Sequence, residues 1–141
     1  MTGSAFLDTN VVVYAFDDDE PGKQEQARAL LITPPTDVLV LSTQVLAEFY
    51  VTVTRKLARP LDPAIAREAV AALSELPVVS TDADLVLAGI DVSDRYQLSL
   101  WDGLIVQAAI AAGCETILTE DLTDGSVLAG VRIQNPFVAA G

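Results

Sequence analysis

The sequence predicts an α/β fold, a three-layer α/β/α sandwich with a central parallel sheet. Short apolar runs, such as residues 5–7 and 38–41, alternate with longer segments of helical periodicity. Strands that are apolar on both faces are typical of parallel sheets with helices on each side. The length of 141 residues suits one domain, so we expect a single domain over residues 1–141.

Five short runs are the predicted strands. They lie at residues 5–7, 38–41, 78–79, 116–119 and 131–133. Each consists mainly of apolar residues and is bounded by polar, Gly or Pro positions, as buried strands are.

The segments between these runs have the signals of helices. We expect helices at residues 11–16, 23–31, about 43–57, 63–76, from about 82 onward, and 101–112. The candidate caps are Thr9 or Asn10, Ser42 or Thr43, Asp62, and Thr81 or Asp82. Residues 11–16 suit a strand by propensity, but the preceding cap favours a short helix. A polar turn at residues 17–22 precedes the second helix, the Pro-rich segment 33–36 ends it, and Gly113 ends the last.

The composition excludes several kinds of catalytic site. The chain has no histidine and one cysteine, Cys114. A Ser–His–Asp triad, a Cys–His pair and a zinc site built from His or Cys ligands are therefore impossible. Any catalysis has to depend on carboxylates, hydroxyls or hard metal ions.

Charge and hydropathy bear on partners and location. The formal net charge of −12 argues against broad nucleic-acid binding, although a bound metal can reverse the sign of one cleft. The lone Cys114, the lack of a basic signal-peptide region and the lack of a long uncharged apolar run predict a cytoplasmic protein with no membrane partner.

Acidic residues follow the predicted strands. Asp8 comes directly after the first strand, Glu48 lies in the helix after the second, and Asp121 follows the strand at residues 116–119. Asp102 lies in the first turn of the helix that leads into that last strand. Because ligand sites of parallel sheets lie at the carboxyl ends of the strands, we expect the four acids to meet at one edge.

Such a cluster needs a counter-charge. Two carboxylates about 4 Å apart repel each other by roughly 4 kcal/mol at an effective dielectric constant of about 20. Oxygen ligands select hard ions, so we expect Mg²⁺ or Mn²⁺ as the cofactor. A metal-activated water can then hydrolyse a phosphodiester without histidine.

Each acid also has an ordinary structural interpretation. Asp8 can cap the helix that follows it, and Ser99 with Asp102 has the spacing of a capping box. Glu48 lies opposite the apolar stripe of its helix, as a solvated residue does. Asp121 lies in a Thr- and Gly-rich turn, where Asp is common. On the residues alone these alternatives stay open.

Four motifs, in order, resemble those of the PIN-domain ribonucleases. They are Phe-Leu-Asp-Thr-Asn at residues 6–10, Ala-Glu-Phe at 47–49, Leu-Trp-Asp-Gly-Leu-Ile-Val-Gln-Ala-Ala at 100–109 and Leu-Thr-Glu-Asp-Leu at 118–122. The segment from Gly125 to Phe137 resembles the C-terminal signature of VapC-type toxins of type II toxin–antitoxin systems. One departure is Gly103, which stands where the family commonly has Ala.

The resemblance implies an endoribonuclease that depends on Mg²⁺ or Mn²⁺. The family's four acidic positions are occupied by Asp8, Glu48, Asp102 and Asp121. By the same resemblance, Asp8, Asp102 and Asp121 are metal ligands, and Glu48 orients the metal or the water.

The resemblance also implies supporting residues and partners. Asn10 and Thr119 match polar positions near the site, and Asp124 is a candidate accessory acid. The substrate is RNA, the protein partner is a small antitoxin, and the chain is expected to form a homodimer.

Two alternatives remain. One is another Mg²⁺-binding α/β domain of the phosphotransfer or phosphatase type. A receiver needs a Lys after the last strand, whereas Lys56 is the last Lys of this chain, and a phosphatase needs a second Asp where this chain has Asn10. The other is a non-catalytic PIN-like scaffold, which has no reason to hold mutually repelling carboxylates together.

Overall fold

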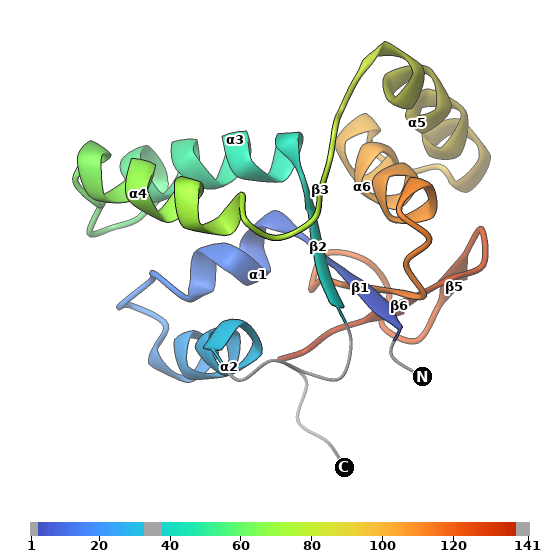
Figure 1. The fold of residues 1–141 in the computed structure, drawn as a ribbon. Coiled ribbons are helices and arrows are strands. Elements are labelled where there is room, and N and C mark those ends of the chain that lie inside the picture. Colours follow the sequence, from blue (N-terminus) through green and yellow to red (C-terminus); the bar gives the residue numbers. More distant parts are fainter. Residues whose placement is uncertain (1–2, 33–37, 138–141) are drawn as a thin grey trace.

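A computed structural model describes residues 3–32 and 38–137 (Figure 1). The strands are β1 (Ser4–Leu7), β2 (Val38–Ser42), β3 (Val78–Val79), β4 (Thr116–Leu118), β5 (Val127–Leu128) and β6 (Val131–Gln134). The helices are α1 (Thr9–Tyr14), α2 (Pro21–Ile32), α3 (Thr43–Val51), the π-helical η1 (Thr52–Lys56), α4 (Pro63–Leu73), α5 (Ala83–Tyr96) and α6 (Leu100–Ala111). None of the described helices is long and apolar enough to cross a bilayer.

The strands form one sheet in the order β3-β2-β1-β4-β6-β5. Neighbouring strands are parallel except for β5 and β6, which are antiparallel. In Figure 1, α1 to α4 lie on one side of the strands and α5 and α6 on the other, and α6 packs against β2, β4 and β6. The predicted α/β sandwich is therefore confirmed, with a sheet that is parallel apart from one edge strand.

The antiparallel edge strand β5 is an addition to the five predicted strands. Leu128 pairs with Val131, so Ala129 and Gly130 form a two-residue hairpin loop. Their φ angles are 51° and 84°, as a type I′ turn with two positive φ values requires. A two-residue strand beside an Ala-Gly turn carries too little pattern to be found in the sequence.

Most predicted helix starts agree with the structure to within two residues. The cap of α1 is neither Thr9 nor Asn10 but Asp8, because β1 passes into the helix without an intervening loop. Helix α2 begins at Pro21, inside the predicted polar turn. The side chains that cap later helices are Ser42, Asp62, Asp82 and Ser99. The Pro-rich segment 33–36 lies outside the described residues.

The helix predicted to continue to about residue 57 changes its hydrogen bonding at Thr52. The N–H of Leu57 donates to the carbonyl oxygen of Thr52 at 3.2 Å, the i→i+5 bond of a π-helix. The Thr54 hydroxyl donates to the carbonyl oxygen of Tyr50 at 2.7 Å, and such side-chain bonds to the preceding turn bend helices. The wider turn changes the direction in which Lys56 leaves the helix.

Strand β1 lies at the centre of the sheet, between β2 and β4, and its residues Phe6 and Leu7 are fully buried. Leu7 is in register with Leu118 of β4. Asp8 and Thr119, the residues that follow these two strands, therefore lie side by side at the carboxyl edge of the sheet. This register is what brings two distant parts of the chain into one site.

Candidate active site

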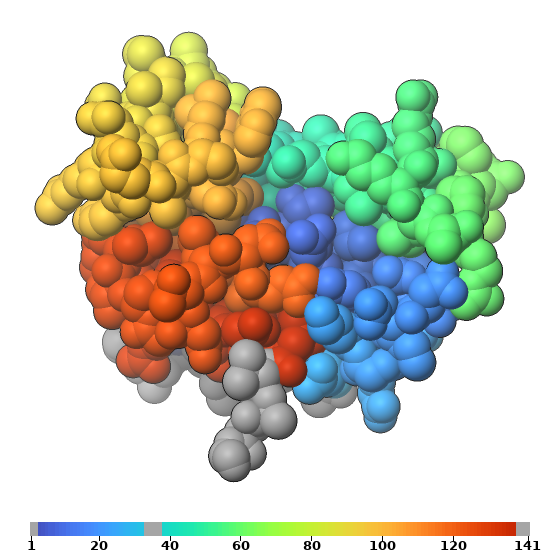
Figure 2. Space-filling view, turned by 180° about the vertical axis from the view of Figure 1, so that it is seen from behind, coloured from blue at the N-terminus to red at the C-terminus, as the bar shows by residue number. Residues whose placement is uncertain are grey.

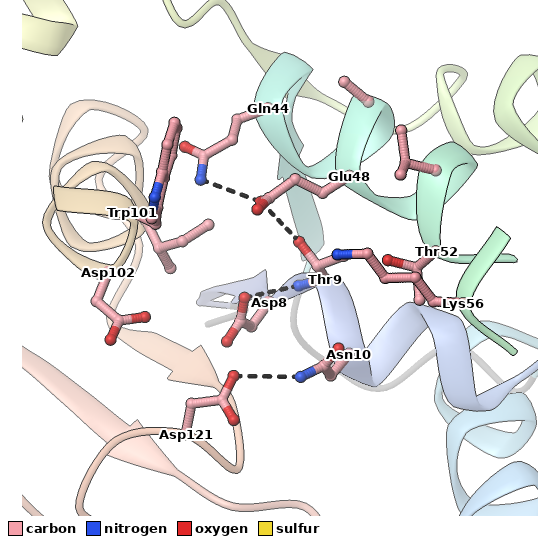
Figure 3. Close-up of a pocket in the computed structure, with 13 residues that line it drawn as sticks. Asp8, Thr9, Asn10, Gln44, Glu48, Thr52, Lys56, Trp101, Asp102 and Asp121 are labelled. Atoms are coloured by element: carbon pink, nitrogen blue, oxygen red, sulfur yellow. Dashed lines mark hydrogen bonds between the residues drawn. The ribbon is translucent and has the colours of Figure 1, made fainter. Parts of the chain in front are cut away.

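A cleft of ≈ 390 Å³ opens at the carboxyl edge of β1. Its lining residues are Asp8, Thr9, Asn10, Gln44, Ala47, Glu48, Val51, Thr52, Lys56, Trp101, Asp102, Ile105 and Asp121. Figure 2 shows the molecule hollowed between the yellow-to-orange α5–α6 pair and the green segment, with blue N-terminal residues at the base. All four acids predicted as site residues line this cleft (Figure 3).

Asp8 is held in a fixed position at the base of the cleft. It is 7% exposed, and its Oδ1 accepts the N–H of Thr9 at 2.7 Å. Its Oδ2 accepts the hydroxyl of the fully buried Thr119, also at 2.7 Å. The Thr119 Oγ1 in turn accepts the N–H of Asp121 at 3.0 Å. Thr119 therefore connects two of the acids through one hydroxyl.

The charge of Asp8 is costly in this position. Burial is the largest cause that raises the pKa of Asp8, from its ordinary 3.8 to about 6, and the negative charges of Asp121 and Asp102 raise it further. The hydrogen bonds from Thr119 and Thr9 oppose this shift without cancelling it. Near neutral pH the base of the cleft holds a buried carboxylate without a cationic partner among the described residues.

Asp102 lies on the α6 wall of the cleft. Its backbone N–H donates to the Oγ of Ser99 at 3.1 Å, so the cap of α6 uses the main chain of Asp102. Burial, followed by the charges of Asp121 and Glu48, raises the pKa of the Asp102 carboxyl. A hydrogen bond between the Ser99 side chain and the carboxylate opposes this rise in pKa, so Asp102 takes part in the cap of α6 and also faces the other acids of the cleft.

Glu48 lies on the opposite wall, on the polar face of α3. Its Oε1 accepts the hydroxyl of Thr9 at 3.2 Å and the amide of Gln44 at 3.1 Å. The residue is half-buried. The face of α3 that looks solvated in the sequence is thus a wall of the open cleft, and two hydrogen bonds hold Glu48 there.

Asp121 is the most open of the four acids. Its Oδ2 accepts the side-chain amide of Asn10 at 3.3 Å. The neighbouring Glu120 turns away from the cleft to pair with Lys23 at 2.9 Å and to accept the hydroxyl of Tyr14. The predicted supporting residues Asn10 and Thr119 therefore contact Asp121 and Asp8 directly.

Asp124 does not line the cleft. Its Oδ1 accepts the backbone N–H of Asn135 at 2.9 Å, which ties the turn before β5 to the end of β6. The structure gives this candidate accessory acid a structural contact.

Five polar or aromatic lining residues are missing from the predicted site, namely Thr9, Gln44, Thr52, Lys56 and Trp101. Gln44 positions Glu48, Trp101 stands beside Asp102, and Lys56 reaches the cleft from η1. The Trp-Asp pair is visible in the sequence as an aromatic next to a site acid. Lys56 is visible in the sequence only as one of three basic residues at a helix end, Arg55, Lys56 and Arg59, which could contact phosphates but equally complement the helix dipole.

The side chains that line the cleft offer the types of oxygen atom that hard divalent ions bind. Carboxylate, amide and hydroxyl oxygens are the ligands of Mg²⁺ and Mn²⁺, and Mg²⁺ commonly uses one or two carboxylates and several waters. Among residues 3–32 and 38–137, no group of three or more acidic or thiol side chains is close enough together to hold a metal ion by itself. The buried charge of Asp8 and its acidic neighbours is the observation that favours a cation here.

The family model of the PIN domain matches residues 5–123. The chain belongs to the PIN-domain family. PIN-domain nucleases generally use divalent metal ions, in agreement with the donor set of this cleft. Comparison with curated protein sequences finds no match.

Several solved structures share the fold of this PIN domain. A VapC toxin of Mycobacterium tuberculosis, described as cleaving the sarcin–ricin loop, is 21% identical with a TM-score of 0.65 over 84% of this chain and 90% of its own. A toxin–antitoxin complex from Klebsiella pneumoniae is 20% identical with a TM-score of 0.69, covering 94% and 98%. A DNA-bound VapBC from Salmonella typhimurium is 21% identical with a TM-score of 0.63, covering 96% and 99%.

Proposed function

We propose that this PIN domain is a metal-dependent endoribonuclease, the toxin of a type II toxin–antitoxin pair. The observation that carries the proposal is the convergence of Asp8, Glu48, Asp102 and Asp121 on one cleft, where burial, followed by the charges of neighbouring acids, raises the pKa of Asp8 and Asp102. A site built only to stabilise the fold gains nothing from such repulsion. The similarity in fold to VapC toxins supports RNA as the substrate.

Asp8, Asp102 and Asp121 are the proposed metal ligands, and Glu48 the group that orients metal or water. A bound Mg²⁺ or Mn²⁺ activates a water molecule and stabilises charge on the phosphoryl oxygens. The chain supplies the rigid frame for this chemistry. Thr119 and Thr9 fix the two oxygens of Asp8, and the Asn10 amide holds one oxygen of Asp121.

The proposed partners follow from the charge of the cleft and from the similar structures. The acidic cleft suits a cationic side chain of a small antitoxin, and the similar structures include a toxin–antitoxin complex and a DNA-bound VapBC. We also propose a homodimer that acts in the cytoplasm, where cellular RNA is the substrate. The lone, buried Cys114 suits a reducing compartment.

The direct test is cleavage of total cellular RNA with Mg²⁺, with Mn²⁺ and with chelator. We expect the wild type to cut only when metal is present, and Asp8→Asn to lose cleavage while it keeps its fold. Glu25→Gln, on the exposed part of α2, is the control because it removes one carboxylate far from the cleft. Cleavage by Asp8→Asn at the wild-type rate would exclude the assignment and leave the non-catalytic scaffold as the better interpretation.

A further inference from the structure

Trp101 is a large apolar side chain left open to water at the mouth of the cleft. It lies in the first turn of α6, directly before Asp102, and is 61% exposed. Figure 3 shows its ring standing on the α6 wall, facing Gln44 of the α3 wall, with Asp8 below it in this view. The ring therefore borders the same space as the acids.

Packing does not account for this ring. Helix α6 is anchored by other side chains, since Leu104, Ile105 and Val106 are buried, and Ser99 caps its N-terminus. Within the described part of the chain, Trp101 pairs with no other aromatic ring. Other large apolar side chains, such as Leu87 and Val127, are equally exposed, but Trp101 is an aromatic ring that lines the cleft itself, where it offers a flat face to a ligand.

The opposite wall carries a free cation. Lys56 extends toward Glu48 and Thr9 across the cleft from the ring (Figure 3) and forms no ion pair with a described residue. The chain's other lysine, Lys23, is occupied by Glu120. An aromatic face on one wall and an ammonium group on the other match the two parts of a nucleotide, its base and its phosphate.

We propose that Trp101 stacks on an unpaired base next to the phosphate that is cleaved, while Lys56 contacts the backbone. This inference rests on the proposed ribonuclease function and deepens it, because it names the two side chains that bind the nucleotide next to the cleaved bond. In a duplex each base is already stacked on both sides and is not available to the ring. Stacking is tolerant of base identity, so Trp101 selects strandedness rather than sequence.

The chain provides its own probe for this contact, because Trp101 is its single tryptophan. The experiment uses the full-length Asp8→Asn protein, which is expected to bind RNA without cutting it. A short single-stranded RNA of mixed sequence is added, and then the same RNA annealed to its complement. Trp emission is expected to change when the single strand is added, and to saturate at the same RNA concentration as the binding measured by anisotropy of labelled RNA. The duplex is expected to leave the emission unchanged.

Kinetics on the otherwise wild-type protein separate stacking from damage to the site. Trp101→Ala is expected to raise KM for single-stranded RNA about 5- to 150-fold, the range of one lost base-stacking contact, with a kcat close to wild type. Trp101→Phe keeps an aromatic face and is expected to restore most of the KM. A purely structural role beside Asp102 would instead lower kcat and metal affinity in both variants.

Three results would overturn the inference. One is RNA binding without a change in Trp emission, and another is wild-type KM in Trp101→Ala. The third is emission that changes with protein concentration alone, which would mean that a second copy of the chain covers the ring. If the wild type cuts RNA, Asp8→Asn does not, and Trp101→Ala behaves as wild type, only the stacking inference fails. If the wild type neither binds nor cuts RNA, the proposed function fails and the inference falls with it.

Discussion

The hydroxyl of Thr119 donates to Asp8 Oδ2 at 2.7 Å, although the two residues are 111 positions apart. They meet because β1 and β4 are neighbours in register, and each residue follows the last residue of its strand. The same Thr119 oxygen accepts the N–H of Asp121. One buried hydroxyl thus sets the relative positions of two acids that the sheet brings together.

Thr119→Val tests this connection, because valine keeps the shape and removes the hydroxyl. We expect a loss of about 1–3 kcal/mol in the free energy of unfolding, since the N–H of Asp121 and one oxygen of Asp8 lose their partner. RNA cleavage should fall strongly. Thr119→Ser, which keeps a hydroxyl, should retain most of the stability and most of the cleavage. Urea unfolding and cleavage rates measure the two effects. Wild-type cleavage by Thr119→Val would show that the hydroxyl does not position the acids.

The pKa of Asp8 predicts a pH dependence of the metal-free protein. A carboxyl whose pKa is raised from 3.8 to about 6 by folding holds its proton more tightly in the folded state. Its contribution to stability is therefore full below about pH 4 and is lost as the pH rises through about 6, by about 3 kcal/mol in total. In chelator, Asp8→Asn should gain stability relative to the wild type over this interval. A constant difference between the two proteins from pH 4 to pH 7 would contradict the shift.

The sequence was sufficient for the arrangement of three of the four acids. Asp8 and Asp121 follow strands, Asp102 begins the helix before one, and the rule that parallel strands share a carboxyl edge predicts that the three lie together. Glu48 was ambiguous, because a helix face that borders an open cleft has the polarity of a solvated face. Helical periodicity alone cannot separate the two.

Other features depend on geometry that no local pattern records. Lys56 lines the cleft from a segment where the helix changes to a π-turn, and helical periodicity read from the sequence does not record that change. The two-residue β5 is set by the turn at Ala129 and Gly130 and by pairing with β6. The role of Asp124 depends on a backbone N–H eleven positions away, at Asn135.

Glu48→Gln, compared with Glu25→Gln, decides between a site residue and a solvated one. Glutamine keeps the side-chain oxygen that accepts from Thr9 and Gln44 but removes the charge. We expect cleavage to fall by at least tenfold in Glu48→Gln and to stay at the wild-type rate in Glu25→Gln. Single-turnover cleavage at saturating metal gives the comparison, and equal rates in the two variants would assign Glu48 to the helix surface alone.

Lys23→Met tests whether the ion pair between Lys23 and Glu120 fixes the loop that carries Asp121. The Lys23 ammonium pairs with Glu120 at 2.9 Å and lies 4.7 Å from the centre of the Tyr14 ring. Because this pair is partly buried, its loss should loosen the loop, lower cleavage and reduce stability by up to about 1 kcal/mol. Arg59→Met breaks the exposed pair with Asp19 and should change neither. Equal effects of the two substitutions would mean that the Lys23–Glu120 pair has no specific role in fixing the loop.

Metal titration connects the acids without knowledge of the RNA. A ligand that binds only the folded state raises stability by RT ln(1 + [L]/Kd), so a weak site is visible at millimolar Mn²⁺. We expect the melting temperature of the wild type and of Glu25→Gln to rise with Mn²⁺ and to fall back on adding chelator. Asp8→Asn and Asp102→Asn should start at a higher melting temperature in chelator, because they relieve the repulsion between buried acids, and should not respond to Mn²⁺. A response of equal size in all four proteins would place the metal elsewhere, whereas no response in any of them would mean that the free cleft binds the ion only together with RNA.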